Sequence, residues 1–362
     1  MVNSRQAQGL IAHTTISCFT FEDGGNLGKM FNLLSTIPTL VESIQKVWFG
    51  SSLFKARKSI ISSIGSLFFC LALSAQSTGF HIHILGIAQD AGYPQADCRK
   101  ECCEAVHSGT QKGASPTSIA IIDKDSSRFW LLEASPEIRD QLRMVQEKFP
   151  KCSLAGILIT HAHIGHYLGL AQLGREVMGA KSVPVYVLPR MKKFLETNGP
   201  WQLLDSLGNI ELRPLEFGNE TQLSKDLKLR PVKVPHRDEY SETAAFDISS
   251  KKSRMLFVPD IDSWDKWDLK IEDILTLFKY AFLDATFFSD NELSGRPMAE
   301  IPHPRVTQSM DRLHGLSKKE KGIVHFIHMN HTNPILRNSP ERQAVLDVGF
   351  NISSENTVLP FP

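Results

Sequence analysis

The chain has 362 residues, of which 42% are hydrophobic and 22% charged. This composition predicts a folded protein with a large core and excludes a disordered chain. Lys and Arg total 40 against 39 Asp and Glu, for a net charge of +1. Because such a balanced chain has no strong electrostatic field, we expect no nucleic acid and no acidic polymer among its partners. The 19 Pro and 23 Gly follow no repeat, so collagen-like and coiled-coil folds are also excluded.

A segment with the pattern of an export signal stands at residues 55–76. Lys55, Arg57 and Lys58 precede an apolar run over 59–75, which ends in small residues. The run is short and weakly apolar for a membrane span, which needs about 20 apolar residues. A signal peptide is therefore the first interpretation, and a retained membrane anchor is the second. A buried helix of an intracellular protein is the third.

The signal interpretation predicts an exported protein, periplasmic or secreted, whose mature chain begins near Gln76. Mass spectrometry that found residues 60–75 in the mature protein would contradict cleavage. Membrane contact is expected only through the apolar run. Residues 1–54 form an extension to which we assign no function, and 77–362 are expected to form one domain.

The rest of the chain alternates between strand and helix patterns. Apolar or alternating runs predict strands at 80–88, 117–123, 128–134, 154–160, 183–188, 210–216, 227–236, 244–248, 253–262, 281–287 and 322–331. Helical spacing predicts helices over 135–149, 167–179, 190–196, 269–277 and 307–313. Strands in runs, interrupted by helices, indicate sheets packed inside helical layers.

Three histidines fall within six residues, directly after the predicted strand 154–160. They are His161, His163 and His166. Imidazoles at i and i+2 beyond a strand end can point to one cation when the loop curls, and the third begins the next helix. The alternative is a polar loop of hydrogen-bonded histidines. We favour a metal site, because functional residues concentrate in such loops.

This cluster resembles the signature His-x-His-x-Asp-His of the metallo-beta-lactamase fold superfamily. The resemblance implies an α/β fold of the αββα kind, in which two mixed sheets are flanked by helices. It also implies later ligands at strand ends, and three residues match in order and placement: His236, Asp260 and His328.

More narrowly, the chain resembles the family of pyrroloquinoline quinone biosynthesis protein B. The similar stretches are LGIAQDAGYPQADC at 85–98, FLDATFFSDNEL at 282–293 and IHMNHTNPILRNSPER at 327–342. The resemblance covers residues 80 to 350. It implies a metal-binding protein connected with a quinone cofactor.

One position departs from the superfamily signature, because Gly165 stands where the signature has Asp. With Asp260 as the one obvious shared anion, two dications would leave an excess positive charge of about 3 in a low-dielectric cleft. We therefore expect a single metal ion. Asp262 and Asp284 are the candidates to replace the missing carboxylate.

The single ion is expected on three imidazoles, with Asp260 as a nearby ligand or base: His161, His163 and His236. A weaker second ion would lie on His166 and His328. Asp260 and His328 are the residues expected to take part in the chemistry. Imidazole and carboxylate ligands suit zinc, although iron and manganese are also accepted. Zinc with an open position lowers the pKa of its bound water to about 7 and so supplies hydroxide for attack on an ester, amide or phosphoester.

A second metal site is predicted from three cysteines that also fall within six residues: Cys98, Cys102 and Cys103. A closed tetrahedral zinc site needs a fourth ligand. In similar phosphodiesterases of phosphonate breakdown, a His three residues beyond the active-site His completes a three-cysteine site, which implies His331. His107 is a local alternative, and free thiols are the interpretation without metal. A structural zinc here would connect the entry loop to the C-terminal strand.

Three functions remain open from the sequence. The first is a metal-dependent hydrolase of a small-molecule substrate, the second an oxidative or maturation step of quinone-cofactor biosynthesis with iron, and the third a non-catalytic carrier of a quinone or anionic metabolite. His303, between two prolines, is either a substrate contact or a turn residue. The sequence contains no Gly-rich phosphate loop and no Gly-x-Ser-x-Gly elbow. It does not predict an oligomeric state.

Overall fold

The computed structural model describes residues 79–293 and 297–362. The signal-peptide-like segment at 55–76 and the extension at 1–54 lie outside these residues, so both stay predictions. In the described part of the chain, no helix is both long and apolar enough to cross a bilayer.

Two seven-stranded sheets face each other in this part of the chain. What we call the N-terminal sheet contains, in spatial order, β14 (Val358–Phe361), β1 (Phe80–Gly86), β2 (Ser118–Asp123), β3 (Arg128–Leu132), β4 (Ser153–Leu158), β5 (Val183–Val187) and β6 (Ile210–Pro214). The C-terminal sheet contains, in spatial order, β13 (Asn351–Ile352), β12 (Val324–Ile327), β11 (Tyr280–Asp284), β10 (Arg254–Val258), β9 (Ala244–Ser249), β8 (Leu227–Lys233) and β7 (Thr221–Ser224). Both sheets mix parallel and antiparallel pairs, as in β3 with β4 and β2 with β3.

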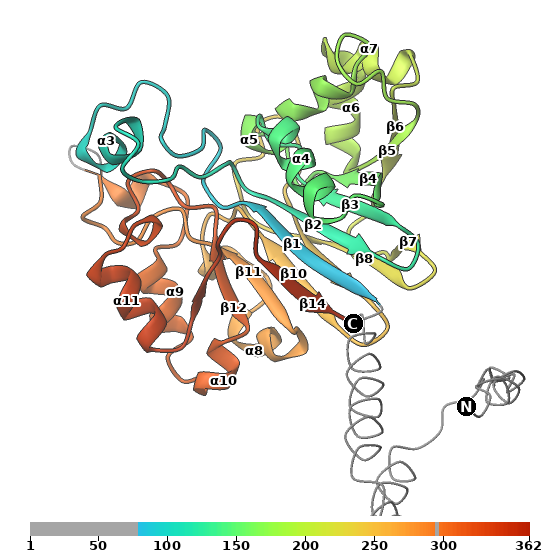
Figure 1. The fold of residues 1–362 in the computed structure, drawn as a ribbon. Helices are drawn as coiled ribbons and strands as arrows, with labels where there is room; N and C mark the ends of the chain where they lie inside the picture. The colour runs from blue at the N-terminus through green and yellow to red at the C-terminus, as the bar shows by residue number, and fades with distance from the viewer. Residues whose placement is uncertain (1–78, 294–296) are drawn as a thin grey trace, which may run out of the picture. The chain divides into compact units, whose positions relative to one another are not determined.

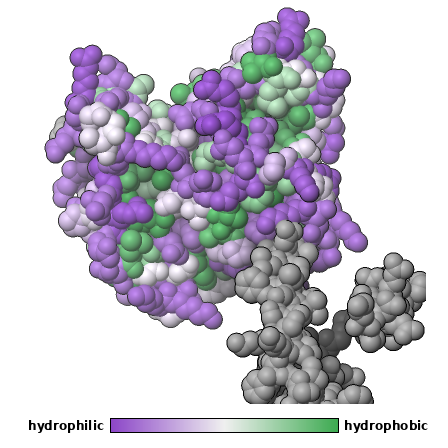
Figure 2. All heavy atoms as spheres, in the orientation of Figure 1, coloured by the Kyte–Doolittle hydropathy of each residue, from purple (hydrophilic) through white to green (hydrophobic). Residues whose placement is uncertain are grey.

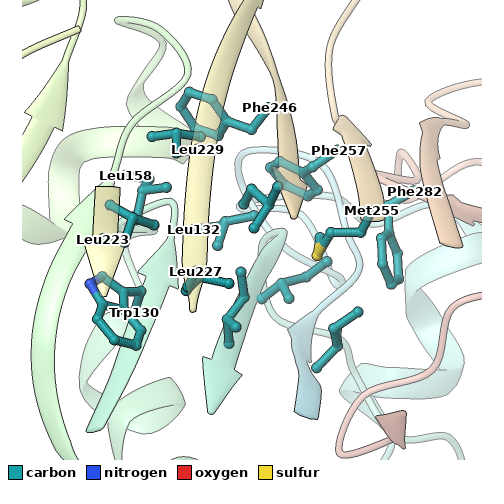
Figure 3. Packing of buried hydrophobic residues seen from close by; sticks show 14 of the residues in the cluster. Trp130, Leu132, Leu158, Leu223, Leu227, Leu229, Phe246, Met255, Phe257 and Phe282 are labelled. Carbon is teal, nitrogen blue, oxygen red and sulfur yellow. The ribbon is translucent and has the colours of Figure 1, made fainter. Parts of the chain in front are cut away.

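The main core lies between the two sheets. Alternation along β1 sends Phe80, Ile82 and Ile84 into this core, because successive side chains of a strand point to opposite faces. Aliphatic and aromatic side chains share this core, and Figure 3 shows Trp130 of β3 in one cluster with Phe246 of β9 and other residues of the C-terminal sheet. Burial of these side chains is the main force that holds the sheets together.

Helices cover the outer face of each sheet (Figure 1). On the N-terminal sheet lie α4 (Ile138–Lys148), α5 (Ile164–Tyr167), the 3-10 helix η1 (Leu168–Leu173), α6 (Pro189–Thr197) and α7 (Trp201–Ser206). On the C-terminal sheet lie α8 (Ile271–Ile274), η3 (Leu275–Leu277), α9 (Val306–Arg312), η5 (Pro334–Leu336) and α11 (Pro340–Asp347). The remaining short helices are α3 (Glu101–His107), η2 (Trp264–Lys266), η4 (Met298–Glu300) and α10 (Lys318–Lys321). The four layers confirm the predicted αββα class.

The structure shortens or corrects some predicted elements. β10 ends at Val258 and β12 at Ile327, so Asp260 and His328 stand in the loops beyond their strands. The helix predicted over 167–179 is wrong beyond η1, because the chain turns at Gly174. The cysteines were expected in a loop, whereas Cys102 and Cys103 lie on α3.

Candidate metal centre

The three clustered histidines lie in the loop that follows β4 and in the short helix after it. β4 ends at Leu158, and the following loop carries His161 and His163 before α5 begins. Backbone hydrogen bonds fix the loop: the amide of Ala162 donates to Ser241 Oγ at 2.8 Å, and that of Ala134 donates to the carbonyl of His166 at 2.8 Å. The imidazoles are therefore held in place by the sheet and its loops.

His161, His163, His236 and Asp260 form what we call the first donor group. His163 Nδ1 lies 2.8 Å from His161 Nε2 and 3.2 Å from His236 Nε2. Asp260 Oδ2 lies 3.5 Å from His161 Nε2, and its Oδ1 lies 3.7 Å from His236 Nε2. Zinc–nitrogen bonds of about 2.0–2.1 Å in a tetrahedron place ligand atoms about 3.3 Å apart. The spacing of these four side chains therefore fits one cation.

Asp90, His166, His328 and the same Asp260 form the second donor group. His166 Nε2 lies 2.9 Å from Asp260 Oδ2 and 3.2 Å from Asp90 Oδ1. His328 Nε2 lies 3.4 Å and 3.8 Å from the same two oxygens. These contacts lack hydrogen-bond geometry, so the buried atoms Asp90 Oδ1, His166 Nε2 and His328 Nε2 have no hydrogen-bond partner. Buried polar atoms are nearly always paired, so three unpaired ones around one point fit a cation site.

Each imidazole of the two donor groups turns its other ring nitrogen toward a protein oxygen. Four are hydrogen-bonded pairs: His161 Nδ1 with Thr160 Oγ1 at 2.9 Å, His163 Nε2 with Glu239 Oε2 at 3.1 Å, His236 Nδ1 with Asp262 Oδ1 at 3.2 Å, and His328 Nδ1 with Thr286 Oγ1 at 3.0 Å. His166 Nδ1 faces Glu133 Oε1 at 3.5 Å without a hydrogen bond. Such partners orient metal-ligating histidines and fix their tautomers. The whole constellation is therefore built to present nitrogen lone pairs inward.

Electrostatics keep the carboxylates ionised. Burial acts to raise the pKa of Asp260, but the facing imidazoles hold that pKa well below its usual range. The pKa of Asp90 also lies well below its usual range, since His166 and His328 outweigh its burial. Burial, with the neighbouring His166, lowers the pKa of His161 well below 6.5 and keeps its ring neutral. Despite burial, the facing carboxylates raise the pKa of His166, His236 and His328. A cation that bound these rings would therefore displace their protons, since metal ligation requires neutral imidazoles and ionised carboxylates.

Cys98, Cys102, Cys103 and His331 form a separate cysteine group. His331 Nδ1 lies 3.5 Å from Cys102 Sγ and 3.3 Å from Cys103 Sγ, and the two sulfurs are 4.0 Å apart. Zinc–sulfur bonds of about 2.3 Å place tetrahedral sulfurs about 3.8 Å apart, so the group fits a closed zinc site. Burial raises the pKa of the Cys103 thiol to about 12, so without a cation this thiol is protonated. His107 lies outside the group and contacts the carbonyl of Cys98.

The structure thus brings together every residue that the sequence placed in a metal site, although metal binding itself stays a prediction. Sequence reasoning missed Asp90 in the turn after β1. It looked instead to Asp262 and Asp284, and neither of these joins His166 and His328. Asp262 contacts His236, while Asp284 accepts hydrogen bonds from two backbone amides and lies 2.8 Å from His303 Nδ1. No local pattern marked Asp90, because its neighbours in the site are remote in sequence.

A small pocket lies beside the donor groups. Its volume is about 240 Å³, and its polar lining includes Gln89, Arg237, His303 and Asn330. Phe287 and Ile301 are among its apolar wall residues. His303 connects the pocket to the metal centre, because its Nδ1 lies 3.4 Å from Asp260 Oδ1. Figure 2 shows the molecular surface hollowed between the lobe of α3 and the lobe of α6 and α7.

The comparison with protein families agrees with this geometry. A model described as "Beta-lactamase superfamily domain" matches residues 128–326, more than half of the chain. The chain belongs to the metallo-beta-lactamase superfamily. Within it, the chain is 26% identical over 307 residues to "Coenzyme PQQ synthesis protein B" of Klebsiella pneumoniae (strain 342), a match that covers 75% of this chain and 95% of the relative. The protein of the same name from Nitrosococcus oceani is also 26% identical, over 313 residues, and the match covers 75% of this chain and 97% of that relative.

Solved structures share the fold of this chain. Zinc-bound PqqB from Methylobacterium extorquens matches with a TM-score of 0.65 at 20% identity, over 77% of this chain and 99% of that one. A diphosphatase from the PhnP family matches with a TM-score of 0.56 at 18% identity, over 77% of this chain and 96% of that one. At these identities the matches establish the fold alone. Both resemblances expected from the sequence, the superfamily and the PqqB-like family, are thereby confirmed.

Proposed function

We propose that this protein is a metal-dependent hydrolase of a small substrate. The observation that carries the proposal is the first donor group, in which three imidazoles and one carboxylate converge beside the pocket that His303 lines. We assign zinc to this group, since imidazole and carboxylate suit it, and a structural zinc to the cysteine group. A bound zinc with an open position supplies hydroxide at neutral pH by lowering the pKa of its water to about 7.

The chain's own residues supply orientation and proton transfer in this proposal. Asp260 lies between the two donor groups, where its carboxylate can accept a hydrogen bond from the attacking water and orient it. His328 lies 3.4 Å from Asp260 and contributes to the chemistry as a ligand of the second donor group. His303 lies between Asp260 and the pocket, with Asp284 fixing its ring, so it is placed to give a proton to a leaving group in that pocket.

The pocket indicates the class of substrate. Arg237 supplies a positive charge, and Gln89 and Asn330 supply amide groups, which together suit an anionic group such as a carboxylate or phosphoester. Ligand pockets usually measure about 300–1,000 Å³, so one of about 240 Å³ favours a small metabolite. We keep export through the segment at 55–76 as a proposal, with no nucleic acid among the partners.

The test is turnover by the purified full-length chain. Loaded with zinc, it is expected to hydrolyse members of a panel of small anionic esters, amides and phosphodiesters. His161→Ala should lower the rate by more than about 100-fold, since loss of an outer-shell partner alone costs up to about that factor. Asp97→Asn is the matched control, because the Asp97 side chain is 90% exposed and belongs to none of the donor groups. A protein that binds zinc, manganese or iron but turns over no member of the panel would contradict the proposal.

A second candidate function rests on the similarity to proteins named for coenzyme PQQ synthesis, which extends over 95% of the Klebsiella relative. In that case the same donor groups hold iron and serve an oxidative or maturation step. The purified chain loaded with iron would then consume oxygen in the presence of a quinone precursor, while zinc would give no turnover. Tight binding of a quinone without either reaction would instead indicate a carrier.

A further inference from the structure

The turn after β1 delivers a carboxylate to the second donor group. Asp90 Oδ1 lies 3.2 Å from His166 Nε2 and 3.8 Å from His328 Nε2. The turn is fixed next to His328, because the amide of Gln89 donates to the carbonyl of Met329 at 2.8 Å and the amide of Met329 donates to the carbonyl of Ile87 at 2.9 Å. The backbone that directly precedes Asp90 is therefore anchored beside His328.

Asp90 occupies the space that a side chain at position 165 would fill. A Cβ atom built on Gly165 would lie 2.2 Å from Asp90 Oδ1 and 2.4 Å from Asp90 Cα. Contacts below 3.0 Å do not occur between real atoms of this kind. A side chain at 165 and the observed position of Asp90 are therefore mutually exclusive. Asp90 can therefore place its carboxylate in the centre only because residue 165 has no side chain.

The charge balance changes with this residue. The expectation of a single ion assumed Asp260 as the one anion between two dications. Asp90 adds a second carboxylate in direct reach of the second donor group, and the buried Glu133 stands behind His166 at 3.5 Å from its Nδ1. Two dications then leave an excess positive charge of about 2 from the two ligating carboxylates, and a hydroxide would reduce it further. A second ion is no longer disfavoured by charge.

We propose that Asp90 is a metal ligand, and that with His166, His328 and the shared Asp260 it binds a second divalent cation beside the first. The facing atoms Asp90 Oδ1, His166 Nε2 and His328 Nε2 are buried without hydrogen-bond partners, which supports a cation between them. The superfamily signature places this carboxylate after β4, at the position of Gly165, whereas in this chain it comes from the turn after β1. The inference concerns metal binding alone and holds whichever reaction the centre serves.

Cobalt provides the test, because it reports the three groups separately. The full-length chain, stripped with a chelator and dialysed against Co²⁺, is expected to bind three equivalents. One gives a thiolate charge-transfer band from the cysteine group, and the other two give ligand-field bands from the donor groups. Asp90→Asn should bind two equivalents, or weaken one by at least about 10-fold, with an unchanged thiolate band. The matched control Asp97→Asn, an exposed carboxylate of the same loop, should bind three.

Two results would overturn the proposal. One is an Asp90→Asn protein that binds three equivalents with unchanged affinities. The other is a wild-type protein that binds a single equivalent outside the cysteine group. Cooperative thermal unfolding of the variant confirms that it is folded. If it is not folded, the test uses Asp90→Ser together with the number of Co²⁺ equivalents that the wild-type protein binds. Since no reading depends on turnover, a missing hydrolase activity leaves this result unaffected.

Discussion

Gly165 is the residue at which the packing of the centre leaves no room for a side chain. In Gly165→Ala the new Cβ would overlap Asp90 Cα, a backbone atom, so the turn after β1 must shift. We expect a loss of about 1–3 kcal/mol in the free energy of unfolding, the usual cost of overpacking, together with weaker binding at the second donor group. Urea denaturation measures the first effect and metal titration the second.

The control is Gly315→Ala, where no atom lies within 4 Å of the new Cβ. This variant should stay within about 0.5 kcal/mol of wild type. Equal stability of the two variants would show that the turn at Asp90 moves freely, contrary to the tight fit described above.

At this scale, the sequence revealed the residues whose type is rare and whose spacing is local. His161, His163 and His166 stand together after a strand, and His331 follows His328 by three positions. Asp90 and Glu133 stayed hidden because each is a common acidic residue, Asp90 in the turn after β1 and Glu133 directly after β3. Their roles arise only when β1, β3 and β4 come together in one sheet, with β2 between β1 and β3. Such contacts between distant segments have no signature in a single sequence.

At the scale of elements, the cysteine group connects three segments of the chain. Cys102 and Cys103 lie on α3, Cys98 lies in the preceding loop, and His331 follows β12. Cys102→Ser should lose one equivalent of zinc. With free zinc at 100 times its dissociation constant, it should also lose about 2.7 kcal/mol of stability. Metal analysis and chemical denaturation of the full-length chain check both numbers.

Cys152→Ser is the matched control, a partly buried free cysteine outside the group. It should keep its zinc. If Cys102→Ser retained both its zinc and its stability, the cysteines would be ordinary thiols.

Elements were predictable where a long apolar run or a strong helical pattern marked them, as in β2, β4 and α4. Short edge elements were not. β13 has two residues and β14 four, and their place is set by pairing with β12 and with β1. α3 escaped because its cysteines and charged residues carry no helical apolar stripe. The secondary structure of such segments depends on tertiary contacts, which sequence periodicity does not reveal.

At the scale of the whole molecule, β12 ties the stability of the C-terminal sheet to pH through His325. Its ring packs 5.6 Å from that of Tyr280 and 5.3 Å from that of Phe282. Burial lowers the pKa of His325 from 6.5 to about 4. The unfolded chain therefore takes up this proton more readily than the folded one. The stabilisation that follows from the neutral ring is complete above pH 6.5 and is lost as the pH falls from about 6.5 to about 4.

The test compares wild type with His325→Phe, which keeps a ring between the same neighbours but cannot be protonated. The difference in free energy of unfolding between the two proteins should shift in favour of the variant by about 2 kcal/mol from pH 7.5 to pH 5. Urea denaturation with a chelator present removes the contribution of metal loss, and the titration of all other groups cancels between the two proteins. A difference that is the same at both pH values would mean that His325 takes up its proton in the folded sheet as easily as in the unfolded chain. The strand would then have to open locally around this ring, and the packing of β12 against β11 would not limit the acid stability of the molecule.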